Sequence, residues 1–174
     1  MKGCIAVTVL GIDPGYAIIG YGVISAENCN FNPIAYGCIT TDADTDFNLR
    51  LKIIFDGMNK VIEKAKPDCI AIEKLYFQNN QKTAIMVAEA RGVILLAAQL
   101  HNIPIFEYTP LQVKTAVTGY GKAKKQQVMD MTKRLLKLRQ MPKPDDAADA
   151  LAIAVCHVQA AGTCLRQKLI SGIN

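Results

Sequence analysis

The sequence predicts a single α/β domain built on a five-stranded mixed sheet, in which three antiparallel strands come before parallel strands and helices flank the sheet. Three apolar runs joined by short turns open the chain and are typical of an antiparallel meander. Further along, helical patterns alternate with short apolar strands, which indicates parallel pairing. The chain has 174 residues, of which 51% are hydrophobic and 20% charged, so it can bury a sizeable core.

The first three strands are predicted over residues 4–12, 18–25 and 34–40. Each run is rich in apolar and β-branched residues, which favour strands. Gly15 supplies the first turn, and the polar residues at 27–30 supply the second. Because short turns join consecutive strands, we expect these three to pair antiparallel.

The rest of the chain reads as helices separated by two short strands. The predicted elements are a helix from Leu49 to Ala65, a strand at 69–73, a helix at 84–100, a strand at 104–108, a basic helix near 122–138 and a last helix at 145–161. Asp46 is a candidate cap for the first of these helices, and Thr109 followed by Pro110 is a second helix start. The helix at 84–100 is apolar on most of its circumference, so we expect burial on two sides.

The domain organisation is simple, because the sequence has neither repeats nor a low-complexity linker. We therefore expect one domain over residues 1–161 and a C-terminal tail over 162–174 that is either a short helix or disordered.

Positive charge is concentrated in one segment of the chain. Between Lys114 and Lys143 there are nine basic residues and one acid, Asp130, so this basic segment carries +8 while the whole chain carries +5. Such a block suits a polyanionic partner such as nucleic acid, and a solvated helix face is the alternative.

The composition also favours a soluble cytoplasmic protein with no membrane partner. Six cysteines lie far apart without a Cys-x-x-Cys pair, which indicates buried thiols in a reducing compartment. The apolar N-terminal run is short, has no small-residue cleavage site and is interrupted by Asp13, unlike a secretory signal. No stretch reaches the roughly 18 uninterrupted apolar residues of a membrane span.

Acidic residues stand where two predicted strands end. Asp13 ends the stretch GID and Glu73 ends AIE, each directly after apolar residues that must be buried. One such acid could be an exposed cap, but two in matching positions indicate a shared site, since sites cluster where strands of a parallel sheet end.

Two further acids begin the last helix. Asp146 and Asp149 are three residues apart, so their Cβ atoms lie about 5–6 Å apart on one helix face. Alanines around them would let the helix approach the sheet, so we expect both acids to face the strand ends. Asp145 is the expected cap of this helix.

Four converging carboxylates require cations, because they would otherwise repel one another or take up protons. Hard divalent ions suit them, Mg²⁺ or Mn²⁺, and paired ions about 3.5–4 Å apart can activate water and stabilise the leaving oxygen of a phosphodiester. Together with the basic segment, this pattern indicates metal-dependent hydrolysis of nucleic acid. Neither His101 nor His157 has a ligand partner at useful spacing, so both are expected on a helix surface or satisfied in the core.

Five blocks of this sequence closely resemble the RuvC family of Holliday junction resolvases, in the family's order and spacing. The blocks are GIDPG…GYGVI, AIEKLYF, ARGV, EYTPLQVK and DDAADALAIA, and they span about Leu10 to His157. The resemblance implies a ribonuclease-H-like fold and a homodimer that resolves four-way junctions in recombination and repair. It implies symmetric paired nicks in strands of like polarity that leave 5′-phosphate and 3′-hydroxyl ends. It further implies cooperation with the RuvA–RuvB branch-migration complex.

The resemblance also implies roles for particular residues. Its catalytic metal ligands correspond to Asp13, Glu73, Asp146 and Asp149. The aromatic residues that reach DNA correspond to Tyr76 and Phe77, whereas Asn79 stands where many members have lysine. Contacts to backbone phosphates correspond to Lys114, Lys122, Lys124 and Lys125. The helix that contains residues 90–92 fits a dimer interface.

Three other classes remain to be weighed. An actin-like or sugar-kinase ATPase begins with a similar strand and acid, but it needs two such domains, which 174 residues cannot supply. A DNA-binding module without catalysis would be expected to lack one of the acids, and all four are present. A ribonuclease H or YqgF-like nuclease is the remaining alternative, and the AIEKLYF and GKAKKQ stretches favour the junction enzyme.

Overall fold

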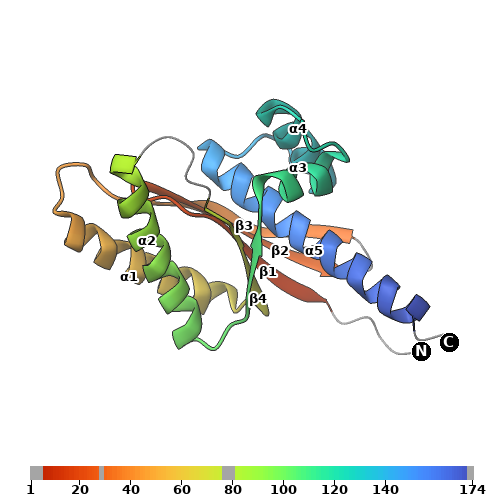
Figure 1. Ribbon diagram of the computed structural model, residues 1–174, viewed down its shortest axis with the longest axis horizontal. Helices are drawn as coiled ribbons and strands as arrows, with labels where there is room; N and C mark the ends of the chain where they lie inside the picture. Colours follow the sequence, from red (N-terminus) through yellow and green to blue (C-terminus); the bar gives the residue numbers. More distant parts are fainter. Residues whose placement is uncertain (1–5, 28–29, 76–80, 172–174) are drawn as a thin grey trace.

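A five-stranded sheet lies between two helical layers in the computed structural model, which describes residues 6–27, 30–75 and 81–171 (Figure 1). The strands are β1 (Val7–Asp13), β2 (Ile18–Glu27), β3 (Asn30–Thr40), β4 (Cys69–Glu73) and β5 (Ile105–Tyr108). The helices are α1 (Phe47–Ala65), α2 (Gln81–Leu100), α3 (Pro110–Thr118), α4 (Lys125–Leu135) and α5 (Asp145–Ser171).

The strand order is β3-β2-β1-β4-β5, with β1, β2 and β3 antiparallel and with β4 parallel to both β1 and β5. The predicted fold class, a mixed α/β sheet of the ribonuclease-H-like type, is therefore confirmed. The third strand starts earlier than predicted, because Asn30 and Asn32 pair with Glu27 and Ser25 through their backbones although their side chains are polar.

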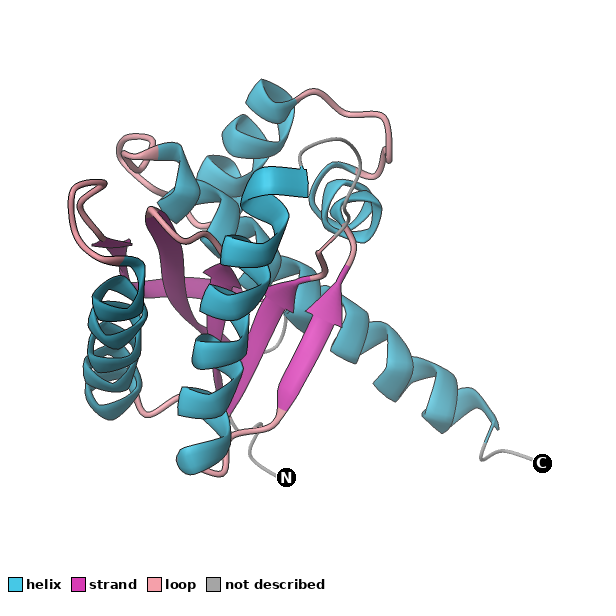
Figure 2. Cartoon of the chain, turned by 60° about the vertical axis from the view of Figure 1, so that its left-hand side comes forward, coloured by secondary structure: helices cyan, strands magenta, loops and turns pink. Residues whose placement is uncertain are grey.

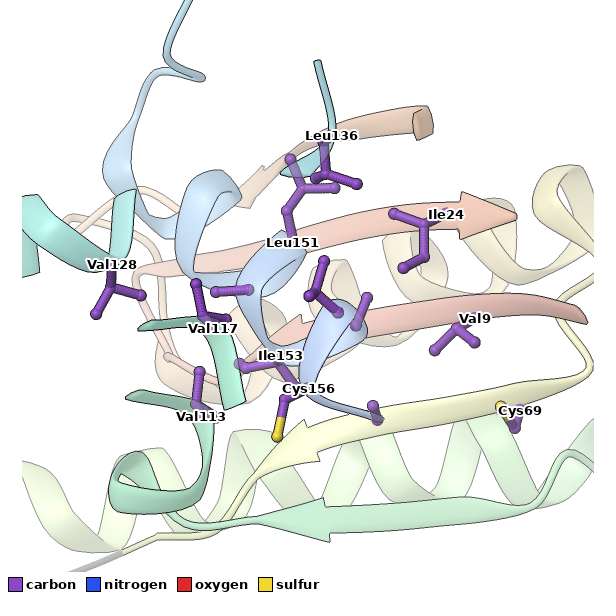
Figure 3. Close-up of a cluster of buried hydrophobic side chains, with 14 of the residues drawn as sticks. Val9, Ile24, Cys69, Val113, Val117, Val128, Leu136, Leu151, Ile153 and Cys156 are labelled. Carbon is purple, nitrogen blue, oxygen red and sulfur yellow. The ribbon is translucent and has the colours of Figure 1, made fainter. Parts of the chain in front are cut away.

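The two helical layers make two separate cores. Helices α1 and α2 cover one face of the sheet, where Leu10 and Ile12 of β1 are fully buried with Ile54 of α1 and Ile94 of α2 (Figure 2). Helix α5 crosses the other face, with α3 and α4 packed beside it. Figure 3 shows Leu151 and Ile153 of α5 among the buried side chains of this second core, with Val9 and Ile24 of the sheet.

Helix α2 is buried on one side only within this chain, whereas burial on two sides was expected. Its inner residues Ala90, Ile94 and Ala97 are completely buried, but a set of large apolar side chains on it is exposed. These exposed residues are Ile85, Met86, Leu96 and Leu100, which we call the α2 face. By length and composition alone, Thr83–Leu100 could cross a membrane. Its packing against α1 and the sheet instead makes it a core helix of this domain.

The predicted helix starts at Asp46 and Thr109 are confirmed. The Asp46 carboxylate accepts hydrogen bonds from the backbone N–H of Asn48 (3.0 Å) and Leu49 (3.3 Å). The Thr109 hydroxyl accepts one from Gln112 N–H at 3.1 Å, and Pro110 is the first residue of α3.

The last two helices differ from their predicted bounds. Helix α4 starts at Lys125, so Lys122 and Lys124 precede it, and it ends where Lys137 takes a left-handed conformation with φ of 51°. Helix α5 runs on to Ser171 without a break at Ala161 and extends beyond the sheet (Figure 2). Asp145 lies inside its first turn rather than at the cap position expected for it.

Candidate active site

The register of the sheet places Asp13 and Glu73 side by side. Ile12 pairs with Ile72 in the parallel ladder between β1 and β4, and the two acids are the next residues on each strand. Neighbouring strands in a sheet lie about 4.8 Å apart, and equivalent residues of a parallel pair point to the same face. The two acids therefore share one corner of the sheet, as the sequence pattern predicted.

Helix α5 reaches this corner because the strands below it have glycines. A Cβ atom on Gly20 would lie 2.0 Å from the carbonyl oxygen of Asp146, and one on Gly11 would lie 2.0 Å from that of Ala150. Gly20 is also the cross-strand partner of Asp13. The backbone of α5 thus touches the sheet where no side chain intervenes, which holds Asp146 and Asp149 beside the strand ends.

Asp13 is in the most strongly perturbed environment of the acids. Burial, together with the negative charges of Glu73, Asp149 and Asp146, raises its pKa to about 7, against a smaller opposing effect of Lys125. These interactions show that all four acids share one electrostatic environment. A carboxyl with a pKa near 7 is one whose negative charge is poorly compensated by the protein alone.

Glu73 and Asp149 show the same imbalance. Burial and the charge of Asp149 raise the pKa of Glu73, while Lys114 lowers it. Burial also raises the pKa of Asp149, although the Lys125 ammonium donates a hydrogen bond to it at 3.0 Å. Lys125 lies 3.5 Å from Asp145 as well, so one exposed lysine is shared between two carboxylates. Two lysines therefore offset part of the charge of this acidic group.

Two adjoining cavities open at the acids. The larger, of about 610 Å³, is lined by Asp13, Pro14, Glu73, Lys74, Leu75, Thr109, Pro110 and Leu111. The smaller, of about 230 Å³, shares Glu73 with it and adds Lys114, Lys125 and Asp149. Asp146 lines neither of these two cavities and lies next to them in the first turn of α5.

Sequence reasoning missed two contributors to this site. Lys74 follows Glu73 and lines the larger cavity, and its backbone N–H donates to the Tyr108 carbonyl at 2.8 Å, which fixes its position. Its position directly after a strand-end acid was a signal available in the sequence. Gly20 was the second, and the stretch GYG in β2 was the signal for close helix approach.

The chemistry of the donor set fits hard divalent cations. Carboxylate oxygens are the ligands that Mg²⁺ and Mn²⁺ prefer, and the raised pKa values of three acids reflect negative charge that a cation would neutralise. Within the described ranges, no group of three or more histidine, cysteine or acidic side chains is arranged so that it could hold a metal ion.

The predicted DNA-contacting residues fall into two groups. Lys114 and Lys125 line the smaller cavity, and Lys122 and Lys124 are exposed in the segment between α3 and α4. Tyr76 and Phe77, like Asn79, lie outside the described residues.

Both histidines have hydrogen-bond partners, as predicted. His157 is buried, and its ring nitrogens hydrogen-bond with the Tyr108 hydroxyl (2.8 Å) and the Cys69 thiol (3.2 Å). His101 hydrogen-bonds with the Asn59 side chain at 2.9 Å. Cys38, Cys69 and Cys156 are free thiols, which agrees with the predicted absence of a disulfide framework for the described cysteines.

A mixed sheet in this order, with acids at the ends of β1 and β4 and on the helix above them, defines a nuclease of the ribonuclease-H-like class. The family model described as crossover junction endodeoxyribonuclease RuvC matches residues 9–157. This chain therefore belongs to the RuvC family.

Relatives and solved structures agree with this assignment. The crossover junction endodeoxyribonuclease RuvC of Desulforamulus reducens is 54% identical over 155 residues, which are 89% of this chain and 95% of that relative. The corresponding protein of Brevibacillus brevis is 54% identical over 151 residues, or 87% of this chain and 91% of the relative. The structure of T. thermophilus RuvC in complex with Holliday junction substrate matches with a TM-score of 0.85 and 32% identity, covering 89% of this chain and 94% of that one. The yeast mitochondrial Holliday junction resolvase Ydc2, at 17% identity and a TM-score of 0.64, shares the fold.

Proposed function

We propose that this chain is a structure-specific endodeoxyribonuclease that resolves Holliday junctions in homologous recombination and DNA repair. It nicks two strands of like polarity symmetrically and leaves 5′-phosphate and 3′-hydroxyl ends. The observation that carries the proposal is the cavity that Asp13 and Glu73 line at the end of the parallel strands, beside a basic segment suited to DNA phosphates. Family membership and the likeness to a junction-bound relative support the choice of substrate.

The proposed metal ligands are Asp13, Glu73, Asp146 and Asp149, which would hold Mg²⁺, or Mn²⁺ in its place, with two ions per active site. Bound ions of this kind activate a water molecule and stabilise the leaving oxygen of a phosphodiester. A cation held by these acids would compete with the proton on Asp13, because burial and the neighbouring acids raise the pKa of Asp13 to about 7.

The remaining residues of the site position the DNA. Lys114 and Lys125 lie next to the acids, so their ammonium groups can bind phosphate oxygens flanking the cleaved bond. Lys122 and Lys124 extend this basic surface, and Tyr76 and Phe77 are proposed to contact bases at the junction. Pro110 and Leu111 give the larger cavity an apolar wall on one side.

Cleavage of three matched substrates tests this function. A four-way junction, a linear duplex of the same sequence and an RNA–DNA hybrid are incubated with and without Mg²⁺. We expect paired nicks only in the junction and only with the metal. Cutting of the RNA strand alone would instead show a ribonuclease H or YqgF-like enzyme and overturn the proposal.

Two acid-to-amide variants test the assigned site. Asp13→Asn is expected to abolish cleavage and to leave junction binding nearly unchanged, because the basic surface remains. Asp56→Asn is the control, since the Asp56 side chain is exposed on α1 and pairs with Lys52 of the same helix. If Asp13→Asn lost binding as completely as cleavage, the metal-binding role of Asp13 would be wrong.

We also propose that the α2 face is the contact between two copies of the chain. A contiguous apolar patch of this kind on a helix is typical of a protein–protein interface. A dimer would also supply the two active sites that symmetric nicking of two strands requires. Gly92 on the same helix has nothing within 4 Å of where a Cβ would lie, which leaves room for close approach.

A charge in the α2 face tests the dimer. Leu96→Asp is expected to convert a two-chain mass to a one-chain mass in light scattering. Leu49→Asp on α1 is the matched control, because Leu49 is 51% exposed and Leu96 is 54% exposed. A two-chain mass for Leu96→Asp at the lowest measurable concentration would exclude this interface.

Cooperation with the RuvA–RuvB branch-migration complex and action in the cytoplasm complete the proposal. Both are supported by family membership. Free thiols at Cys38, Cys69 and Cys156 are in keeping with a reducing compartment.

A further inference from the structure

The turn between α3 and α4 is held rigidly by its own backbone and one threonine. The backbone N–H of Tyr120 donates to the Thr118 hydroxyl oxygen at 3.2 Å, and that hydroxyl donates to the Lys114 carbonyl at 2.8 Å. The Tyr120 carbonyl accepts a hydrogen bond from Ala123 N–H at 3.1 Å. Gly119 ends α3 in the left-handed conformation with φ of 76°. Both backbone polar groups of Tyr120 are thus bonded.

The side chain of Tyr120 takes no part in this arrangement. The residue is 58% exposed, and no hydrogen bond or ring contact of its side chain is found among the residues that the structure describes. Because the backbone is already fixed and a tyrosine side chain has only two χ angles, little conformational entropy is lost when a partner covers this ring.

The surroundings of Tyr120 specify the chemistry of that partner. Lys122 and Lys124 follow it in the chain, both are exposed, and no acid lies between Lys114 and Lys125. An exposed aromatic ring among lysines is suited to a nucleic acid, whose phosphates pair with the ammonium groups while a base stacks on the ring.

The turn is joined to the catalytic cavity through Leu111. A Cβ atom on Gly121 would lie 2.5 Å from Leu111 Cδ1, so the Gly121 backbone rests on the Leu111 side chain. Leu111 in turn lines the cavity that contains Asp13 and Glu73. The residue that follows Tyr120 therefore contacts a side chain that lines the cavity of Asp13 and Glu73.

We propose that the Tyr120 ring stacks on a DNA base next to the cleaved phosphate and so helps to position the strand in the active site. This inference rests on the proposed function and adds a residue to it that the family resemblance did not assign. Stacking of a base on an aromatic side chain is worth about 1–3 kcal/mol, which corresponds to roughly 5- to 150-fold in affinity.

Three substitutions separate stacking from other contacts. Tyr120→Phe keeps the ring and is expected to bind a four-way junction within about twofold of the original protein. Tyr120→Leu keeps much of the apolar surface without a ring, and Tyr120→Ala removes both, so both are expected to bind roughly 5- to 150-fold more weakly. Binding is measured in Ca²⁺ to prevent cleavage, with 2-aminopurine placed at positions flanking the cleavage site. Its fluorescence should be quenched by the original protein and by Tyr120→Phe only.

The control is Tyr36→Ala, which removes another exposed tyrosine, 39% exposed, from β3. It should leave binding unchanged, and melting temperatures show that each variant is folded. Equal binding by the leucine and phenylalanine variants would overturn stacking, as would unchanged binding by Tyr120→Ala. If the original protein fails to cut the junction, the proposed function fails instead, so the two failures are distinguishable.

Discussion

Replacement of Gly20 by alanine adds one methyl group at the point where α5 touches the sheet. The new Cβ would lie 2.0 Å from the Asp146 carbonyl oxygen and 2.4 Å from its carbon. These are backbone atoms in the first turn of a 27-residue helix, so they cannot rotate away as a side-chain tip could. The helix start must therefore lift off β2, and Asp146 and Asp149 lift with it.

The required movement sets the expected effects. Relief of the contact to the 3.4 Å of ordinary packing needs a shift of about 1.4 Å. Overpacking of this kind costs about 1–3 kcal/mol, or roughly 2–12 °C in melting temperature for a domain of this size. A misplacement of about 1 Å in an active site lowers the rate on the order of 100-fold. We therefore expect Gly20→Ala to lose cleavage far more than stability.

The assay compares single-turnover cleavage of a four-way junction, junction binding and thermal unfolding. Gly162→Ala is the control, because it makes the same change in α5 where nothing lies within 4 Å of the new Cβ. It should cleave normally and gain up to about 1 kcal/mol from helix propensity. Cleavage by Gly20→Ala at the original rate would refute the view that this contact aligns the acids.

Three further predictions concern charge. The pKa of Asp13 is about 7 in the folded chain, against an ordinary value of 3.8, so the folded chain keeps a proton that the unfolded chain loses. Without metal, stability should therefore fall as the pH rises from about 4 to 7, and Asp13→Asn should remove much of that fall in thermal melts in EDTA. Burial lowers the pKa of His157 from 6.5, so below pH 6.5 the unfolded chain binds a proton that the folded chain does not, and stability should drop on acidification. His157→Asn, compared with His157 in the Asp13→Asn background, should reduce that drop in urea titrations. Lys125→Met removes a partner that lowers the pKa of Asp149, so the pH profile of cleavage should move to higher pH. The shift should be less than about one pH unit, because an exposed ion pair is worth about 0.2–1 kcal/mol. Lys60→Met on α1 is the control and should leave the profile unchanged.

The five strands and their mixed antiparallel and parallel pairing were predictable, because local apolar runs marked the strands and the connections between them indicated the pairing. The stretch CIAIE is apolar, flanked by breakers and too short for a helix, and β4 indeed covers Cys69–Glu73. The ends of α4 and α5 were not predictable to the residue. Lys137 ends α4 through its backbone conformation, and residues after Ala161 continue a helix already nucleated upstream, which no local composition reveals.

The acids of the site could be placed together from the sequence because parallel strands end at one edge. Asp13 and Glu73 required only that their strands be neighbours, which the ladder between β1 and β4 bears out. The distance between α5 and the sheet could not be predicted in the same way, because it depends on contacts between residues far apart in sequence, such as Gly20 and Asp146. Lys125 likewise reaches Asp149 only through the packing of α4 on α5.

The close contact between α5 and the sheet also affects the charge of the acids in this site. The glycines that admit α5 bring its backbone against the sheet beside Asp13, and burial is the largest cause of the raised pKa of Asp13. A carboxyl group that is costly to ionise without a partner gains more from a cation than an exposed one does, because its electrostatic interactions are less screened. Ligand binding to the folded state adds stability that grows with the logarithm of the ligand concentration relative to its Kd. The same α5 contact that destabilises the metal-free acids should therefore make Mg²⁺ a stabilising ligand, with an effect larger at pH 8 than at pH 5. A Gly20→Ala chain, with α5 lifted and Asp13 better hydrated, should lose that difference together with its cleavage.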